Sequence, residues 1–387
     1  MTITDGDERE LVAWLVRHGI EDDREDALLD GFCARLVEAG LPVVRAVLGA
    51  DLLHPLFDAR SYTWRRGGGI QSATFPRGTL YEESEDWRVS PFGWLLSGGH
   101  RELRRRLDGS YRRGEFPLLD RFQDEGMTDY LALAVPFPEA ATLGKVDGIL
   151  SSFQTDREGG FTDRQVALIR RLIPPLALAF KAINAVQTGR TLMATYLGQD
   201  AGRRVLSGSI DRGRAETLDC VLWYSDLESF TRIADTVPED ELLALLNDYA
   251  ECVVDVVHAH EGQVLKFMGD GILAIFPLAS DGAACARALD AAARLRRELA
   301  ALNERRAAAG RPATGFYLAL HVGAVLYGNI GSRERLDFTV VGPAVNEAAR
   351  IEAMCRSLDQ WLIVSAAFAA AAGATRGRLV SLGRYAL

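Results

Sequence analysis

The stretch GQVLKFMGDGILAIFP, residues 262–277, is predicted to form two β-strands joined by a tight turn at Gly269, Asp270 and Gly271. The two glycines permit unusual backbone angles and let a ligand approach the turn closely. An aspartate in such a turn commonly has only a structural role. Whether Asp270 has a chemical role therefore depends on the residues around it.

A second aspartate, Asp226, ends the apolar strand DCVLWYSDL at residues 219–227. Two carboxylates presented from adjacent strand ends form a hard-oxygen site for Mg²⁺ or Mn²⁺, with substrate phosphates completing the ligand shell. The residues that follow, LESFT, are predicted to begin a helix. Free backbone N–H groups at a helix start can hold phosphate oxygens.

Strands and helices alternate along the C-terminal half of the chain. The order strand, helix, strand, strand, helix, strand is that of a ferredoxin-like α+β sheet. The first strand and the hairpin are those described above, and the other elements follow from apolar periodicity. They are helices at 239–262, 281–303 and 345–356, strands at 315–331 and 335–342, and a strand running into a helix at 361–368.

Three further side chains deserve a functional interpretation beside a structural one. Lys266 lies on the strand four residues before Asp270, and this even spacing puts the two on one face before the turn rotates Asp270 out. Asn346 and Arg350 are four residues apart on one predicted helix and share a face. Arginine suits the geometry of a triphosphate. Each of these patterns is also common in proteins without any such role.

Three blocks of this sequence, in their order and separation, resemble the signature blocks of class III adenylate and guanylate cyclases. They are VLWYSDLESFT (221–231), VLKFMGDGILAIF (264–276) and DFTVVGPAVNEAARIE (337–352). The resemblance covers about 170 residues, from Asp219 to the end of the chain. It implies two metal ions, Mg²⁺ or Mn²⁺, held by Asp226 and Asp270. One ion would activate the ribose 3′-hydroxyl, and the other would bind the β- and γ-phosphates.

The resemblance also implies roles for the residues that contact the nucleotide. Lys266 and Thr339 would recognise the purine, Asn346 would orient the ribose, and Arg350 would stabilise charge on the pentavalent phosphorus. A threonine at position 339 is typical of the subgroup that includes bicarbonate-responsive cyclases. The substrate would also contact the loop after the first aspartate, which consists of Leu227, Glu228, Ser229, Phe230 and Thr231.

The pair Lys266 and Thr339 favours adenine. Lysine can donate to adenine N1 and threonine can accept from the N6 amino group, whereas guanine presents the opposite groups. We therefore expect an adenylate cyclase that converts ATP to 3′,5′-cyclic AMP and pyrophosphate. In the family, the aspartates and the Asn/Arg helix of one site come from different protomers, which implies a homodimer. The alternatives are a guanylate or pyrimidine nucleotide cyclase and a catalytically weak, dimeric nucleotide-binding sensor.

The sequence departs from the family pattern at two places. Ser229 stands where the family usually has glycine, and Glu228 adds negative charge beside the expected phosphate site. The chain ends at SLGRYAL, before the later basic block and final strand of the family, so we expect either that the C-terminal end is truncated or that this protein lacks that element. From both departures we expect reduced activity or an altered metal requirement.

The N-terminal half, residues 1–186, is predicted to be an α/β sensor or regulatory domain. We expect helices over 8–48, an irregular region at 49–130, and strands at 130–137 and 147–155. A helix at 162–186 should be kinked or broken at Pro174 and Pro175. The segment GGFTDRQVALIRRLIPPLALAF (159–180) is similar to the closing half of GAF-type domains.

GAF domains commonly bind a small ligand or dimerise, so an unidentified small ligand is a possible partner here. Trp64, Trp87, Trp94 and His100 either line a pocket or form plain core, and we expect core. Residues 187–217 are predicted to be a connector helix and loop, followed by the cyclase domain at 218–387.

The composition limits the partners of the chain. Its 387 residues carry a net charge of −9, which argues against binding nucleic acid or an anionic membrane surface. Five widely spaced cysteines, an acidic N-terminus and no long apolar run are typical of a cytoplasmic protein.

Overall fold

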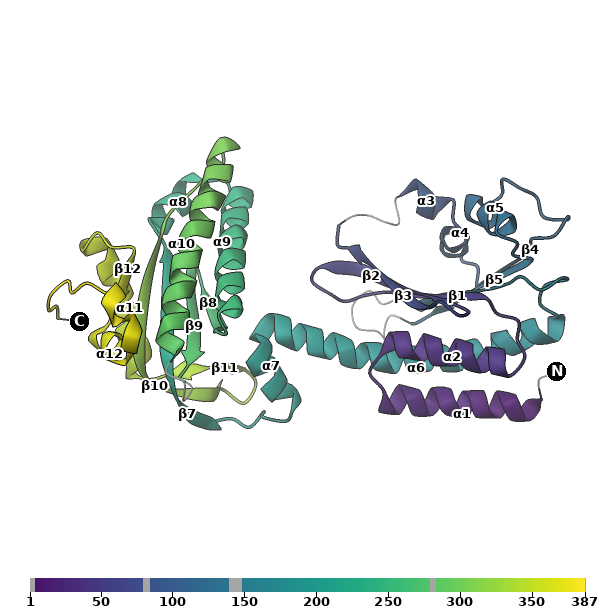
Figure 1. Cartoon of the computed structure of the whole chain (residues 1–387), viewed down its shortest axis with the longest axis horizontal. Helices are drawn as coiled ribbons and strands as arrows, with labels where there is room; N and C mark the ends of the chain where they lie inside the picture. The colour runs from purple at the N-terminus through teal and green to yellow at the C-terminus, as the bar shows by residue number, and fades with distance from the viewer. Residues whose placement is uncertain (1–3, 79–83, 139–147, 279–282, 387) are drawn as a thin grey trace. The chain divides into compact units, whose positions relative to one another are not determined.

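A computed structural model describes residues 4–78, 84–138, 148–278 and 283–386 (Figure 1). The chain divides into two compact units, residues 1–192 and 193–387, and the division falls within helix α6 (Asp163–Leu197). Both units combine helices with a sheet whose strands are antiparallel, except that β12 pairs with β10 in parallel in the C-terminal unit. Among the described residues, no helix has both the length and the apolar character that a membrane span requires.

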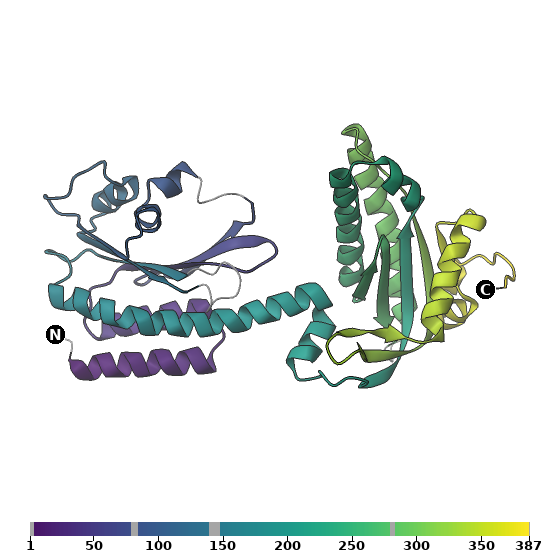
Figure 2. The same ribbon diagram turned by 180° about the vertical axis from the view of Figure 1, so that it is seen from behind.

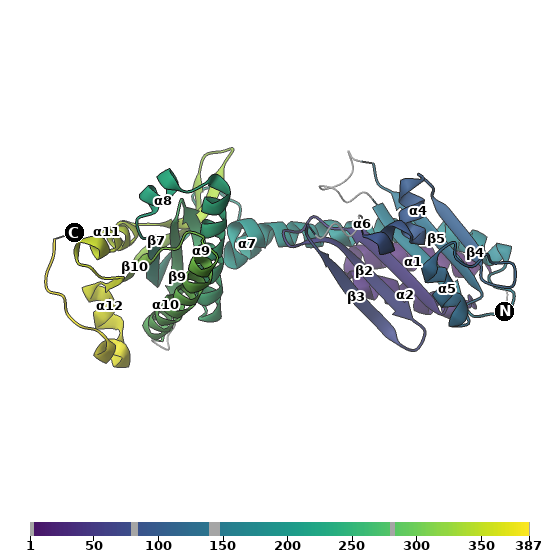
Figure 3. The same ribbon diagram turned by 90° about the horizontal axis from the view of Figure 1, so that it is seen from above.

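The N-terminal unit is built on a six-stranded sheet with the order β3-β2-β1-β6-β5-β4. Every neighbouring pair in it is antiparallel. Helices α2 and α6 cover one face with α1 on their outer side, and α3, α4 and α5 lie on the other face (Figure 1 and Figure 3). The elements that precede α6 are α1 (Asp5–Glu21), α2 (Glu25–Glu38), β1 (Arg45–Asp51), β2 (Phe57–Arg65), β3 (Gly69–Pro76), α3 (Glu85–Arg88), α4 (Pro91–Ser97), β4 (Glu102–Arg106), α5 (Pro117–Asp124), β5 (Asp129–Pro136) and β6 (Gly148–Thr155).

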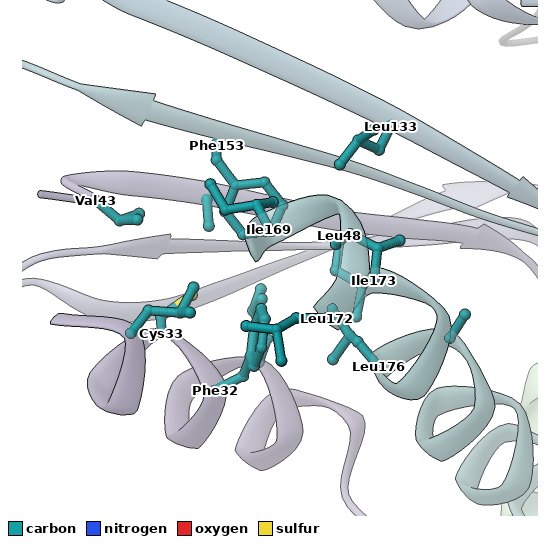
Figure 4. Close-up of a cluster of buried hydrophobic side chains, with 14 of the residues drawn as sticks. Phe32, Cys33, Val43, Leu48, Leu133, Phe153, Ile169, Leu172, Ile173 and Leu176 are labelled. Carbon is teal, nitrogen blue, oxygen red and sulfur yellow. The ribbon is translucent and has the colours of Figure 1, made fainter. Parts of the chain in front are cut away.

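The main core of this unit lies between the sheet and helices α2 and α6. Figure 4 shows Phe32 of α2 and Leu172 of α6 facing Phe153 and Leu48 of the sheet. All four side chains are fully buried. The opposite face of the sheet carries a smaller core beneath α4 and α5, which includes Leu95 and Leu119.

Several predictions for this half were wrong. The region 49–130 is not irregular, because it contains β2, β3, β4 and three short helices. Residues 45–48 belong to β1 and not to a helix. Pro174 and Pro175 do not break α6. Leu172, Ile173 and Leu176 around them are buried against the sheet, and this packing compensates for the missing backbone donors.

The aromatic residues proposed as plain core divide into two groups. Trp64 is in the core, and its indole N–H donates to Asp30 at 3.0 Å. Trp87 and His100 instead line a cavity between the sheet and α3 and α4, so the expectation of core was wrong for them. Trp94 stacks on His100 with ring centroids 4.1 Å apart. The cavity exists because the sheet beneath these residues carries small side chains.

The C-terminal unit has the predicted order of strands and helices, and its sheet order is β11-β10-β7-β9-β8 (Figure 2). Helices α9 and α10 pack on one face and α11 on the other. The connector prediction was wrong in part, since a helix occupies 199–206 and β7 already begins at 215. The elements are α7 (Gln199–Leu206), β7 (Ala215–Leu227), α8 (Phe230–Thr236), α9 (Glu239–Ala259), β8 (Gln263–Met268), β9 (Gly271–Pro277), α10 (Ala284–Ala308), β10 (Phe316–Gly331), β11 (Leu336–Val341), α11 (Pro343–Ser357), β12 (Leu362–Val364), α12 (Ala366–Ala371) and a 3₁₀-helix (Gly373–Arg378).

The strands β10-β7-β9-β8 form the four-stranded sheet of a ferredoxin-like unit. Strand β7 lies in its centre, so Val221 and Trp223 are fully buried. The predicted hairpin is confirmed, because Met268 of β8 pairs with Gly271 of β9 across a two-residue turn. Gly269 has a φ of +70°, which a residue with a side chain adopts at a cost. The central strand and the hairpin turn carry the two aspartates.

A buried hydroxyl pair fixes α9 against β7 immediately before Asp226. The Tyr249 hydroxyl donates to Ser225 Oγ at 2.9 Å, and Trp223 Nε1 donates to the same oxygen at 3.1 Å. Replacing Tyr249 with phenylalanine should lower the free energy of unfolding of this unit by about 1 kcal/mol, because one buried hydrogen bond is lost. Calorimetry of the full chain measures this. The exposed Tyr196 provides the control, and an equal shift in Tyr196→Phe would contradict the assignment.

Candidate active site

Asp226 and Asp270 are brought together at one end of the C-terminal sheet. The backbone N–H of Leu227 donates to Asp226 Oδ1 at 3.1 Å and to Asp270 Oδ2 at 3.2 Å. This contact arises because β7 pairs with β9, where Ser225 lies opposite Ile272. The end of β7 therefore lies beside the hairpin turn. The two predicted carboxylates therefore lie next to each other within one chain.

The two carboxylates repel each other in their ionised forms. Burial, a hydrogen bond with Asp270 and the charges of Asp270 and Glu352 raise the pKa of Asp226 to about 8. Burial also raises the pKa of Glu352, with Asp270 adding to the effect and Arg356 opposing it. A divalent cation between the two aspartates would remove the repulsion, so the donor set fits Mg²⁺ or Mn²⁺.

Glu352 is a nearby acid that the sequence reasoning missed. It lies on α11, which packs against β7 and β10. No local pattern marks it, because its closeness to Asp226 depends on how α11 lies on the sheet. Among the described residues, however, no group of three or more acidic, histidine or cysteine side chains is placed to hold one metal ion. Phosphate and water oxygens would have to complete the shell, as is usual for Mg²⁺.

The loop after Asp226 is held by the segment that immediately precedes β10. The Glu228 N–H donates to the Gly315 carbonyl at 3.0 Å, and the Thr314 hydroxyl donates to the Glu228 carbonyl at 2.6 Å. Ser229 adopts a left-handed conformation with φ 56° and ψ 29°. This is the backbone region that favours glycine, so the serine at this family position is strained. The Glu228 side chain is exposed, as is that of Thr231.

The backbone donors of this loop are divided between two uses. Within the described chain, the N–H groups of Ser229, Phe230 and Thr231 have no backbone acceptor. That of Leu227 is already engaged by the two aspartates. The loop can therefore offer three N–H groups to a phosphate, while Leu227 positions the carboxylates.

The predicted base-recognising residues lie close to each other. The Lys266 ammonium forms an ion pair with Asp337, the second residue of β11. Thr339 lies two residues further along the same strand and so on the same face, where it is half-buried. Asp337 was not predicted as a site residue. Its alternation with Thr339 in the sequence is a signal that could have indicated it.

Asn346 and Arg350 are both exposed on α11, on the side away from its buried residues Ala348 and Ile351. Within the described chain, neither side chain forms a hydrogen bond or ion pair with Asp226 or Asp270. Within one chain, Asp226 and Asp270 therefore lie beside each other. Lys266 lies beside β11, the strand that carries Thr339. This arrangement leaves the asparagine and arginine free to contact another molecule.

Comparison with known proteins gives the class of the C-terminal unit. Residues 214–367 match the family of the adenylate and guanylate cyclase catalytic domain, so this part of the chain is a class III cyclase catalytic domain. Adenylate cyclase 1 of Rhizobium meliloti is 28% identical over 192 residues, which are 49% of this chain and 29% of that protein. An adenylate cyclase of Anabaena cylindrica is 30% identical over 152 residues, or 38% of this chain and 30% of that protein.

An uncharacterized protein of Mycobacterium tuberculosis is 34% identical over 221 residues, which cover 54% of this chain and 38% of that protein. The chain thus spans about a third of the length of the curated relatives it matches. Among solved structures, the guanylyl cyclase Cya2 has 29% identity and a TM-score of 0.38, covering 41% of this chain and 80% of that one. A bacterial light-regulated adenylyl cyclase has 29% identity and a TM-score of 0.37, covering 40% and 78%.

Proposed function

We propose that this chain is an adenylate cyclase that converts ATP to 3′,5′-cyclic AMP and pyrophosphate in a homodimer. The observation that carries the proposal is the pair Asp226 and Asp270, which converge on the N–H of Leu227 within a cyclase catalytic domain. Asp226 and Asp270 would hold two ions of Mg²⁺ or Mn²⁺. When bound, these ions supply charge neutralisation of the phosphates and activation of the ribose 3′-hydroxyl.

The remaining steps belong to side chains of the protein. Lys266 donates to the purine and Thr339 accepts from it, which fixes the base. Asn346 orients the ribose so that its 3′-oxygen lies in line with the α-phosphorus. Arg350 donates to the phosphate oxygens, whose negative charge grows in the transition state. The exposure of Asn346 and Arg350 supports a site shared between two copies of the chain.

We propose further that residues 1–186 form a GAF-like regulatory domain, that 187–217 connect it to the catalytic domain, and that catalysis belongs to 218–387. Support comes from α6, a single helix that begins in the N-terminal unit and ends in the C-terminal one. A continuous helix is a rigid element through which a change in one unit can reach the other.

Guanylate cyclase activity is a second candidate, which Asp337 favours. A carboxylate beside Lys266 can accept from guanine N1–H while the lysine donates to O6. The test is a panel of ATP, GTP, CTP and UTP with Mn²⁺ and the purified full-length chain. Turnover confined to ATP supports the proposal. Faster turnover of GTP would establish the second candidate, and an absence of turnover with all four nucleotides would leave a nucleotide-binding sensor.

The double variant Lys266→Glu with Thr339→Cys should lower the ATP-to-GTP ratio of kcat/KM by about tenfold or more. The reason is that the substitutions remove the lysine donor to adenine N1 and the threonine acceptor for the N6 amino group. The ratio is measured by quantifying cyclic nucleotide at several substrate concentrations. The control is Lys181→Glu, which makes the same charge change in the N-terminal unit. An unchanged ratio in the double variant would remove Lys266 and Thr339 from base recognition.

A further inference from the structure

The N-terminal unit contains a cavity of about 620 Å³ between its sheet and helices α3 and α4. Its roof is apolar and includes Trp87 of α3 and Phe92 and Leu95 of α4. Cavities of this size are typical of sites for small molecules. The cavity is not part of the catalytic domain, and the proposed reaction does not use it.

The cavity exists because its floor carries small residues. Ser61, Gly49, Leu150 and Ala134 face one another in register across four adjacent strands. Three of these four side chains are too small to reach the roof. The opposite face of the same strands carries large residues such as Phe153 and packs tightly against α2 and α6. An apolar space of this kind inside a folded unit forfeits contacts that a ligand would restore.

An arginine marks the polar end of the cavity. Arg45, at the start of β1, lies in register with Gln154 and Tyr130 on the next two strands. Its Nη1 donates to Gln154 Oε1 at 3.1 Å, and its guanidinium lies 4.9 Å from the centre of the Phe122 ring. Its Nε is buried and has no acceptor among the described residues.

Within the described chain, Arg45 has no carboxylate in ion-pair contact. Burial lowers the pKa of this guanidinium and the charge of Arg65 adds to the effect, whereas Tyr130 and the more distant carboxylate of Glu125 oppose it. Arg101 also lines the cavity, as does Arg60, whose guanidinium is paired with Glu25 of α2 at 3.7 Å; Asp51 is the single acidic residue of the cavity lining among those described. Arg45 is half-buried with its Nε enclosed, and partly desolvating a cation that has no carboxylate in contact is costly. The cavity therefore favours a negatively charged ligand.

We propose that this cavity binds a small organic carboxylate, with its carboxylate on Arg45 and its apolar body beneath Trp87, Phe92 and Leu95. The planar guanidinium matches the geometry of a carboxylate, and the open Nε donor is available to it. The apolar roof and floor exclude a fully hydrated anion. Residues Arg45, Tyr130 and Ser152 define the polar end, and Gly49 and Ala134 define the space for the body of the ligand.

Isothermal titration of the full-length chain tests this site without reference to cyclase activity, so its outcome is independent of the proposed function. The probes are octanoate, 4-phenylbutyrate and 3-indolepropionate, each compared with the corresponding neutral alcohol, together with inorganic phosphate. We expect saturable binding of at least one acid. Its neutral alcohol and inorganic phosphate should each bind with a Kd at least about tenfold higher, or not at all. No binding of any acid, or equal binding of acid and alcohol, would overturn the proposal.

Variants assign the contact. Arg45→Met should weaken the bound acid about tenfold and abolish the preference over the alcohol, whereas Arg45→Lys should keep the preference. Ala134→Phe should remove binding of acid and alcohol alike, because it fills the cavity. Arg65→Met is the matched control, since Arg65 lies opposite Arg45 but does not line the cavity. Circular dichroism verifies folding, and acid binding that survives both Arg45→Met and Ala134→Phe would overturn the assignment.

Discussion

Replacing Asp270 with alanine should lower metal-dependent turnover about a thousandfold while leaving the chain folded. The carboxylate lies at the tip of a two-residue turn, so its removal disturbs little of the sheet. Its loss would leave Asp226 as the single aspartate at the site, and the negative charge of the triphosphate would be poorly compensated. Electrostatic contributions of this kind are commonly worth about two to three orders of magnitude in kcat.

The measurement is cyclic AMP formation with saturating ATP across a Mn²⁺ titration. Asp255→Asn is the matched control, because it removes the same charge from an exposed position of α9 in the same unit. The control should retain the activity of the unmodified chain. If Asp270→Ala reached the same rate as Asp255→Asn at any Mn²⁺ concentration, Asp270 would not be a metal ligand.

The C-terminal unit could be predicted well from the sequence because its decisive signals are local. The hairpin at 262–277 has its glycines at the turn and apolar residues on both sides, so its geometry follows from neighbouring residues. The strand and helix order then leaves few possible sheets. Asp226 and Asp270 meet because they end neighbouring strands of such a sheet.

The N-terminal unit was harder to predict because its strands lack a clear apolar alternation. Strand β3 has mostly exposed residues, and β2 mixes small and polar residues with Tyr62 and Trp64. On β2, the small residues Ala59, Ser61 and Thr63 line a cavity and not a packed core, so the usual periodic signal is absent. Pro174 and Pro175 were misleading for a related reason, since the packing of α6 overrides their local preference.

Contacts between distant segments were beyond the reach of the sequence. Lys266 and Asp337 are 71 residues apart, and their ion pair depends on how β11 lies relative to β8. Glu352 approaches Asp226 only because α11 packs across the sheet. The same limitation applies to Arg45: the sequence shows a charged residue, but it does not show that the Nε of this residue is buried beside an apolar cavity.

A heterodimer of Asp270→Ala and Arg350→Ala chains should recover about half the activity of the unmodified homodimer, although each single variant is nearly inactive. In a two-fold symmetric dimer, each site takes its aspartates from one chain and its arginine from the other. The mixed dimer then holds one site with both defects and one intact site. The exposure of Arg350 and its lack of contact with the aspartates in one chain are the basis for this expectation.

The two variants are co-expressed with different affinity tags, and the heterodimer is isolated by tandem purification before cyclic AMP formation is measured. A heterodimer of Asp270→Ala with Asp226→Ala is the matched control. Both of its sites receive a defective pair of aspartates, so it should remain inactive. If the Asp270→Ala and Arg350→Ala heterodimer were as inactive as this control, both residues would have to act from the same chain. If the two chains could not be purified together, the site would not be shared between protomers, and the exposed asparagine and arginine of α11 would need another partner.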